Sequence, residues 1–203
     1  MRIAKCLLAS TVVGLATGLG IAHAQEPTSI DASDSPVYDA KGQLIKPENY
    51  RQWVLIGTGL NMAYGPLRAA SSGHPMFTNV FVSPSAYRAF LRTGAWPDKT
   101  LFILEGRGAA TVNHSTTGGN GYYQGEIMGI EAEVKDASRF QNKWAFFALG
   151  MGAAPGILLP TTAECYACHA TNAAVENTFV QFYPILRDVA KDKGTLKDVP
   201  KSF

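Results

Sequence analysis

The chain of 203 residues is long enough for one domain with a sizeable core, and 46% of its residues are hydrophobic. Its 18 Lys and Arg residues nearly balance its 16 Asp and Glu residues, which does not indicate nucleic acid as a partner. After the first segment no stretch approaches eighteen uninterrupted apolar residues, so we expect no membrane partner for the mature protein.

Residues 1–24 have the pattern of a secretory signal peptide. Arg2 and Lys5 form a positive start, residues 7–21 are apolar or small, and an A-x-A site predicts cleavage after Ala24. Cys6 leaves with this segment, so two of the three cysteines remain in the mature chain.

The next residues divide into a leader, one domain and a tail. Residues 25–38 are rich in Ser, Asp, Pro and Thr and lack periodicity, which predicts a flexible leader. We expect the domain over residues 39–195 and the tail over residues 196–203.

The domain is expected to begin with a short helix at residues 47–52. A second helix should run from Pro84 to Arg92, with Ser83 as N-cap and Gly94 after its end. Its expected apolar side consists of Tyr87, Phe90 and Leu91.

The β-strands are predicted from apolar runs and alternation between glycine-rich or proline-rich breaks. They lie at residues 53–56, 77–82, 101–105, 122–134 and 143–149. We expect the first to stop at the glycines of residues 57–59, and residues 113–121 to form a hairpin loop. In the fourth strand, alternation places Tyr123, Ile127 and Glu131 on one face.

A C-terminal helix is expected at residues 175–190, with a kink at Pro184. The whole pattern predicts an α+β domain with an antiparallel β-sheet, short helices and a C-terminal pair of helices.

The first helix of that pair carries the sequence Cys165-Tyr166-Ala167-Cys168-His169. This C-x-x-C-H run is the signature of c-type haem attachment, in which two thiols bind the macrocycle and the histidine binds iron. Residues 161–164 fit a capping box that would begin the helix. We therefore expect one haem c between the sheet and the C-terminal helices, and export then predicts a periplasmic location.

Two other interpretations of the C-x-x-C pair are weaker. A zinc site needs further ligands, and besides His169 the mature chain offers only His74 and His114. A thioredoxin-like pair lies near the start of a βαβ unit, whereas this pair lies near the end of the chain.

The sixth coordination position decides what a haem protein does. Small electron carriers place a Met after the motif, but here every Met lies before it. His74, His114 and Met76 stay open as ligands that fold back, and an electron shuttle would need one of them. We expect an open or water-filled position.

Several separate stretches together resemble one known family. They are NYRQWV (49–54), SPSAY (83–87), TG (93–94), GNGY (119–122), GIEAEVKD (129–136), NKWAF (142–146), TAECYACH (162–169) and FYPILR (182–187). Over about residues 37–190 the chain resembles the cytochrome P460 family. This resemblance implies an antiparallel β-sheet domain, a homodimer, five-coordinate haem c and a distal pocket formed by the sheet.

The resemblance also assigns distal residues. The family's hydroxylamine-oxidising enzymes link a lysine to the haem edge, and that position holds Leu104 here, which cannot form the bond. Thr78 takes the place of an arginine on the neighbouring strand. Glu131 matches a distal carboxylate that can accept protons, although a partly solvated strand-end glutamate would look the same.

Loss of the lysine makes the chain similar to the cytochrome c′-β branch of the family, whose members bind nitric oxide and carbon monoxide. Phe102 lies two residues before Leu104, so both should face the iron, although core packing explains Phe102 equally and Phe77 or Phe81 could replace it. The first interpretation is a binder of nitric oxide or a related nitrogen species. The alternative is a hydroxylamine or nitric oxide oxidoreductase with Glu131 as base and a soluble cytochrome as redox partner.

Overall fold

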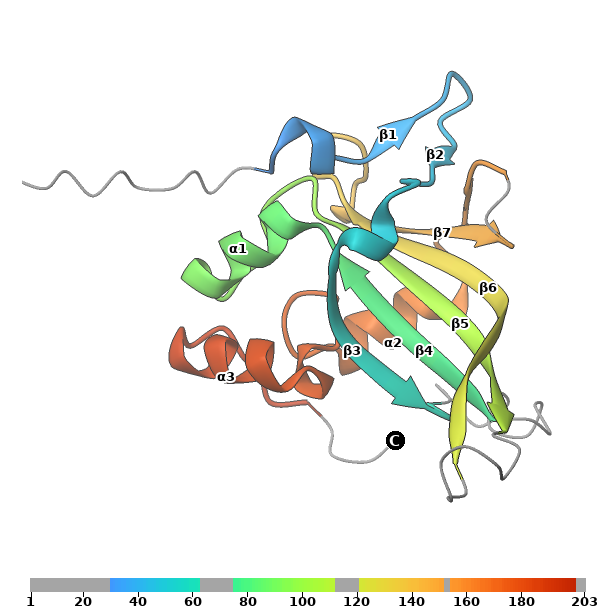
Figure 1. Ribbon diagram of the computed structural model, residues 1–203. Coiled ribbons are helices and arrows are strands. Elements are labelled where there is room, and N and C mark those ends of the chain that lie inside the picture. The colour runs from blue at the N-terminus through green and yellow to red at the C-terminus, as the bar shows by residue number, and fades with distance from the viewer. Residues whose placement is uncertain (1–29, 63–74, 112–120, 152–153, 200–203) are drawn as a thin grey trace, which may run out of the picture.

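The computed structural model describes residues 30–62, 75–111, 121–151 and 154–199 (Figure 1). Within these residues a six-stranded sheet has the order β3-β4-β5-β6-β7-β8, with every neighbouring pair antiparallel. The strands are β3 Val54–Leu60, β4 Met76–Val82, β5 Leu101–Thr111, β6 Tyr122–Lys135, β7 Trp144–Gly150 and β8 Ile157–Leu158. The predicted α+β class is confirmed.

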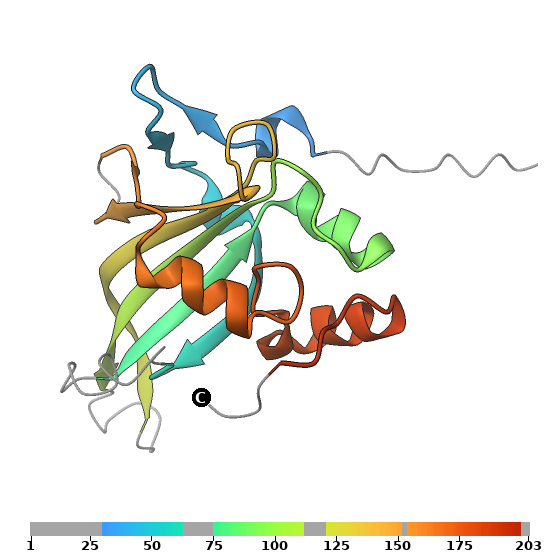
Figure 2. The same ribbon diagram turned by 180° about the vertical axis from the view of Figure 1, so that it is seen from behind.

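The remaining elements surround this sheet. They are β1 Val37–Tyr38, β2 Leu44–Ile45, the helices α1 Pro84–Thr93, α2 Glu164–Asn172 and α3 Pro184–Asp192, and the 3-10 turns η1 Ala32–Asp34, η2 Tyr50–Gln52 and η3 Val180–Phe182. Seen from behind, α2 lies across one face of the sheet, with α3 beside it (Figure 2). No helix among the described residues is both long enough and apolar enough to span a bilayer.

Each face of the sheet carries its own apolar cluster. On one face, Ile103 and Phe147 pack with Tyr50 and with Leu44 of the small β1–β2 sheet. On the other, Phe102 and Trp144 pack with α1 and α3 through Phe90 and Leu186. The sheet therefore separates two environments, and strand alternation decides which one a side chain enters.

Helix α1 has the predicted ends. Pro84 is its first residue, and Gly94 ends it in the left-handed conformation (φ 71°), donating its N–H to the carbonyl of Phe90. Ser83 occupies the N-cap position without a side-chain cap, and the predicted burial of Leu91 is wrong because Ala86 and Ala89 fill the core side.

Strand β3 does not stop at its glycines. It continues through Gly57 and Gly59 to Leu60, with a register shift after Leu55. A Cβ at Gly57 would lie 2.5 Å from the ring of Tyr183, so this glycine permits close packing rather than a break.

Strand β6 contains an irregularity that alternation could not foresee. Its register to β5 shifts between Gly106 and Arg107, so Ile127 packs in the same cluster as Ile130. The expected shared face of Ile127 and Glu131 is therefore wrong, and Glu131 lies on the opposite side, beside α2.

The C-terminal helices also differ from expectation. Helix α2 begins at Glu164 after Ala163 without a side-chain cap, so the predicted capping box does not form. The single helix expected at 175–190 is η3 followed by α3, because Pro184 starts a helix instead of kinking one.

The expected leader is described from residue 30 onward, and this part contacts the domain. The backbone N–H of Ser85 donates to Asp34 Oδ2 at 2.9 Å, and Asp31 pairs with Arg88 at 3.1 Å. The hairpin loop predicted at 113–121 lies almost wholly outside the described residues.

Candidate functional site

A cavity of about 90 Å³ lies between the sheet and α2. We call it the main pocket. It is lined by Val80, Phe102, Leu104, Glu131, Ala132, Glu133, Phe146, Phe147, Leu159, Cys165, His169, Thr178, Phe179 and Tyr183.

The C-x-x-C-H run forms most of α2. Cys165 and His169 line the main pocket, one helical turn apart, while Cys168 lies on the same helix without lining it. Neither cysteine is in a disulfide, and burial raises the pKa of the Cys165 thiol. Asn172 Nδ2 lies 3.7 Å from Cys168 Sγ.

The imidazole of His169 is held on three sides. Its Nδ1 lies 2.6 Å from the carbonyl oxygen of Asn177, and its ring packs edge-on against Phe146 and Phe179, with centroids 4.6 and 4.5 Å away. Because a carbonyl can only accept, Nδ1 carries a proton, and in the neutral ring Nε2 then keeps its lone pair. That is the tautomer an iron ligand requires.

The loop that carries Asn177 is fixed from outside. Trp96 Nε1 donates to Thr178 Oγ1 at 2.8 Å, and Lys135 Nζ pairs with Glu176 Oε2 at 2.6 Å. These contacts lie on either side of Asn177, so they position the carbonyl that orients His169.

Two predicted distal residues lie opposite each other on neighbouring strands. Leu104 of β5 pairs in register with Glu131 of β6, and both line the main pocket. Phe102 lines it too, and its ring also packs against Trp96 and Trp144. The sheet wall is therefore mainly apolar, with two carboxylates from β6, the solvent-exposed Glu131 and the partly buried Glu133.

The family model for Cytochrome P460 matches residues 47–180 of this chain. The chain belongs to the cytochrome P460 family. This makes it a c-type haem cytochrome, as the C-x-x-C-H run predicts. A search among curated protein sequences gives no significant match.

The residues present fit the haem of a P460 cytochrome. The thiol of Cys165 and the imidazole of His169 meet at one largely apolar pocket, and the hydrogen bond at Nδ1 leaves Nε2 for iron. Among the described residues no three His, Cys, Asp or Glu side chains group to hold a metal ion.

The one acidic pocket residue that sequence reasoning about this P460 domain did not single out is Glu133. It lies two positions after Glu131 on the same face of β6, and its Oε1 lies 3.5 Å from Nδ1 of His169. Burial raises the pKa of Glu133, and His169 only partly offsets this. Burial alone would lower the pKa of His169, but Glu133 raises it. The period-2 alternation from Glu131 was the available signal.

Thr78 is not part of the main pocket. It lines a neighbouring cavity of about 30 Å³ with Met62 and Gly57, and that cavity shares Val80 and Tyr183 with the main pocket. The Thr78 hydroxyl is buried and has no hydrogen-bond partner among the described residues.

The candidates for a sixth ligand are not brought to the main pocket by the described residues. His74 and His114 lie outside the described residues, and Met76 does not line the pocket. Phe77 and Phe81, the alternatives to Phe102, do not line it either.

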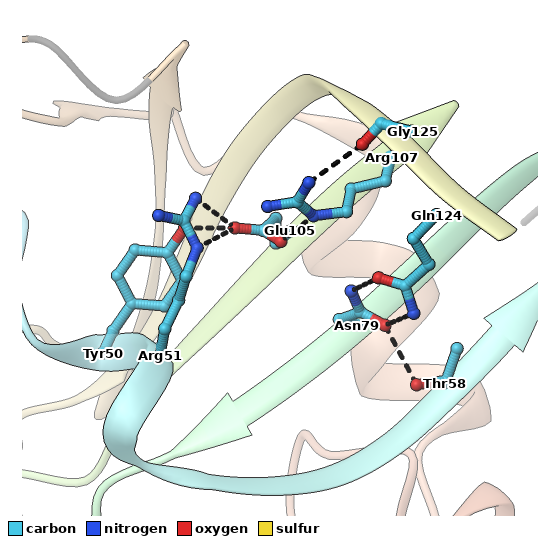
Figure 3. Close-up of polar contacts among 8 residues, drawn as sticks. All are labelled: Tyr50, Arg51, Thr58, Asn79, Glu105, Arg107, Gln124 and Gly125. Atoms are coloured by element: carbon cyan, nitrogen blue, oxygen red, sulfur yellow. Dashed lines mark hydrogen bonds and ion pairs between the residues drawn. The ribbon is translucent and has the colours of Figure 1, made fainter. Parts of the chain in front are cut away.

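The opposite face of the sheet carries a second buried carboxylate, Glu105 (Figure 3). Tyr50 and Arg51 donate to one of its oxygens and Arg107 to the other; Arg51 Nη2 lies 2.7 Å away. Burial alone would raise the pKa of Glu105, but these hydrogen bonds hold it below its ordinary value. Burial also raises the pKa of Tyr50, to about 12.

Proposed function

We propose that this P460 cytochrome binds nitric oxide or a related small nitrogen species at one haem c. Cys165 and Cys168 would attach the haem, and His169 would be its axial ligand. When bound, the haem would supply an iron with one open coordination position. The observation that carries the proposal is the pocket lining, because no lysine, methionine or second histidine is among the described residues that form it.

The walls of the pocket support a preference for small apolar ligands. His169 approaches from α2, whereas Leu104, Phe102 and Val80 come from the sheet opposite. Aliphatic and aromatic groups offer no hydrogen bonds, so this part of the lining suits a diatomic molecule better than a large polar ligand. This lining favours the cytochrome c′-β branch over the lysine-modified enzymes.

We also propose a periplasmic homodimer. The signal pattern of residues 1–24 supports export, and the family resemblance supports the dimer. Neither depends on the pocket.

The test is the absorption spectrum of the matured protein, oxidised and reduced, with and without nitric oxide. We expect a high-spin ferrous spectrum, without the red-shifted band of a lysine-modified haem, that converts on addition of the gas. A low-spin spectrum indifferent to nitric oxide would mean that a side chain fills the sixth position, and it would favour electron transfer instead.

A second candidate function is oxidation of hydroxylamine or nitric oxide, with a soluble cytochrome as electron acceptor. It is favoured by Glu131, a solvent-exposed carboxylate in the pocket wall that can accept a substrate proton. Under this function, replacing Glu131 by Gln should lower turnover about 100-fold, in the usual range for a general base. The matched control is Glu126→Gln, since Glu126 is an exposed residue of the same strand that does not line the pocket. If Glu131→Gln leaves turnover unchanged, Glu131 is not the general base.

A further inference from the structure

We propose that Glu133 is a positioning residue for His169, acting as a second acceptor for the Nδ1 proton and so making the imidazole a stronger electron donor to iron. The proposal rests on the proposed function in one respect, namely that His169 holds the haem. It names the group that would set the reduction potential of the site.

The first support is the isolation of the carboxylate. The Glu133 side chain is 13% exposed, and its buried Oε1 has no hydrogen bond of normal length to any residue that the structure describes. A buried acceptor of this kind needs an explanation, because nearly all buried polar atoms in proteins are paired. Among the described contacts, the nearest donor to Oε1 is Nδ1 of His169, at 3.5 Å.

The second support is the neighbouring charges. Lys135 follows two positions later in β6 and would be the natural partner of Glu133. Instead it pairs with Glu176 and donates to the carbonyl oxygen of Trp96, both at 2.6 Å. Lys135 is thus directed away from Glu133, and its charge is balanced by Glu176. His169 is therefore the partner that remains for Glu133.

The third support is the surroundings of the pair. In the sheet register, Glu133 lies between Phe102 of β5 and Phe146 of β7, and Phe146 also packs on the His169 ring. Apolar neighbours lower the local dielectric constant, which strengthens the interaction between a carboxylate and an N–H group. A carboxylate at this place therefore acts more strongly than its distance alone suggests.

A carboxylate behind a metal-bound histidine raises the basicity of the ring nitrogen that binds the metal. A more basic ligand favours the oxidised, more positive iron and strengthens the bond between iron and Nε2. The Asn177 carbonyl, at 2.6 Å, contributes in the same direction and stays when Glu133 is replaced. Loss of Glu133 should therefore lower the basicity of His169 Nε2 only in part, because the Asn177 carbonyl still accepts the Nδ1 proton.

The experiment compares the haem-loaded wild type with Glu133→Gln, Glu133→Asp and the control Glu126→Gln. Reduction potentials and the iron–histidine stretching frequency of the ferrous protein, from resonance Raman spectra, are measured at one pH. For Glu133→Gln we expect the oxidised-to-reduced ratio at fixed applied potential to fall about tenfold, a rise of about 59 mV, and the stretching frequency to drop. Glu133→Asp should give a smaller shift, and Glu126→Gln should match the wild type.

An unchanged potential and stretching frequency in Glu133→Gln overturn the proposal. So do equal shifts in the Gln and Asp variants, since these would indicate packing rather than charge. If Glu133→Gln does not mature, Glu133→Asp decides alone: an upward shift supports the role and an unchanged potential overturns it. Failure of the proposed function would give a different result: the wild type would have a low-spin spectrum that does not change on addition of nitric oxide.

Discussion

Glu105, which is buried, and Glu133, which is partly buried, are carboxylates on neighbouring strands, and they face opposite sides of the same sheet. Glu105 is 1% exposed and accepts hydrogen bonds from Tyr50, Arg51 and Arg107. The Glu133 side chain is 13% exposed, and its buried Oε1 has no hydrogen bond of normal length among the described residues. The pKa of Glu105 is lowered and that of Glu133 is raised. The donors around a carboxylate, and not its burial alone, decide the direction of the shift.

This difference separates a structural role from a functional one. The Glu105 cluster joins η2 to β5 (Figure 3), and none of its residues lines the main pocket. Within the described part of the chain, Oε1 of Glu133 has no hydrogen bond of normal length, yet it lies beside the predicted iron ligand. Removing the first should therefore cost stability, and removing the second should change the haem.

The largest effect is expected for Glu105→Gln. The amide cannot satisfy two guanidinium groups and a phenol, and its own N–H groups would face Arg51 and Arg107. We expect the free energy of unfolding to fall by about 2–4 kcal/mol, below the upper range for buried pairs because Arg51 is half exposed. Denaturant unfolding of the haem-loaded protein measures this, with Glu126→Gln as control. A decrease in the free energy of unfolding of less than about 0.5 kcal/mol would contradict a structural role for Glu105.

The Glu105 cluster should also make the stability of the wild type depend on pH in the acid range. A carboxyl whose folded-state pKa is lowered contributes stability above its unfolded pKa, about 4.3, and that contribution is lost as the pH falls through the folded-state pKa. Between about pH 5 and pH 3 the wild type should thus lose more stability than Glu105→Gln. Unfolding free energies across this range test the prediction, and parallel curves for the two proteins would contradict it.

On the pocket side of the sheet, we expect Gly57→Ala to lower the stability by less than Glu105→Gln does. The new Cβ would lie 2.5 Å from the Tyr183 ring, which lines the main pocket, so the ring must move. We expect a loss of about 1–3 kcal/mol together with a change in the rate of nitric oxide binding. Gly129→Ala is the control, because a Cβ there has nothing within 4 Å. Unchanged binding kinetics would show that Tyr183 does not shape the pocket.

The sequence predicted the parts of this molecule that depend on local patterns. The ends of α1 followed from Pro84 and Gly94, and two residues of the C-x-x-C-H run, Cys165 and His169, line the main pocket. Features that depend on distant partners were missed. The β6 irregularity reverses the expected face of Ile127 relative to Glu131, and no local signal marks it.

Glu105 and Glu133 also show that a residue's distant partners cannot be read from local sequence patterns. Glu105 looks like the charged end of an apolar strand until Tyr50 and Arg51, more than fifty residues earlier, fold onto it. Glu133 gains its importance from His169 and Asn177, which follow it by thirty-six and forty-four residues. Alternation gives a residue its face of the sheet, but tertiary packing chooses its partner.

The smallest stability effect is expected for Glu133→Gln. This carboxylate has no normal hydrogen bond at Oε1 to lose, and a neutral amide costs less to bury than a charged group. We expect the free energy of unfolding to stay within about 1 kcal/mol of the wild type, or to rise, while Glu105→Gln loses more. Denaturant unfolding of both haem-loaded variants side by side measures the contrast. Equal losses would mean that Glu133 also supports the fold, and that its unpaired oxygen is no guide to function.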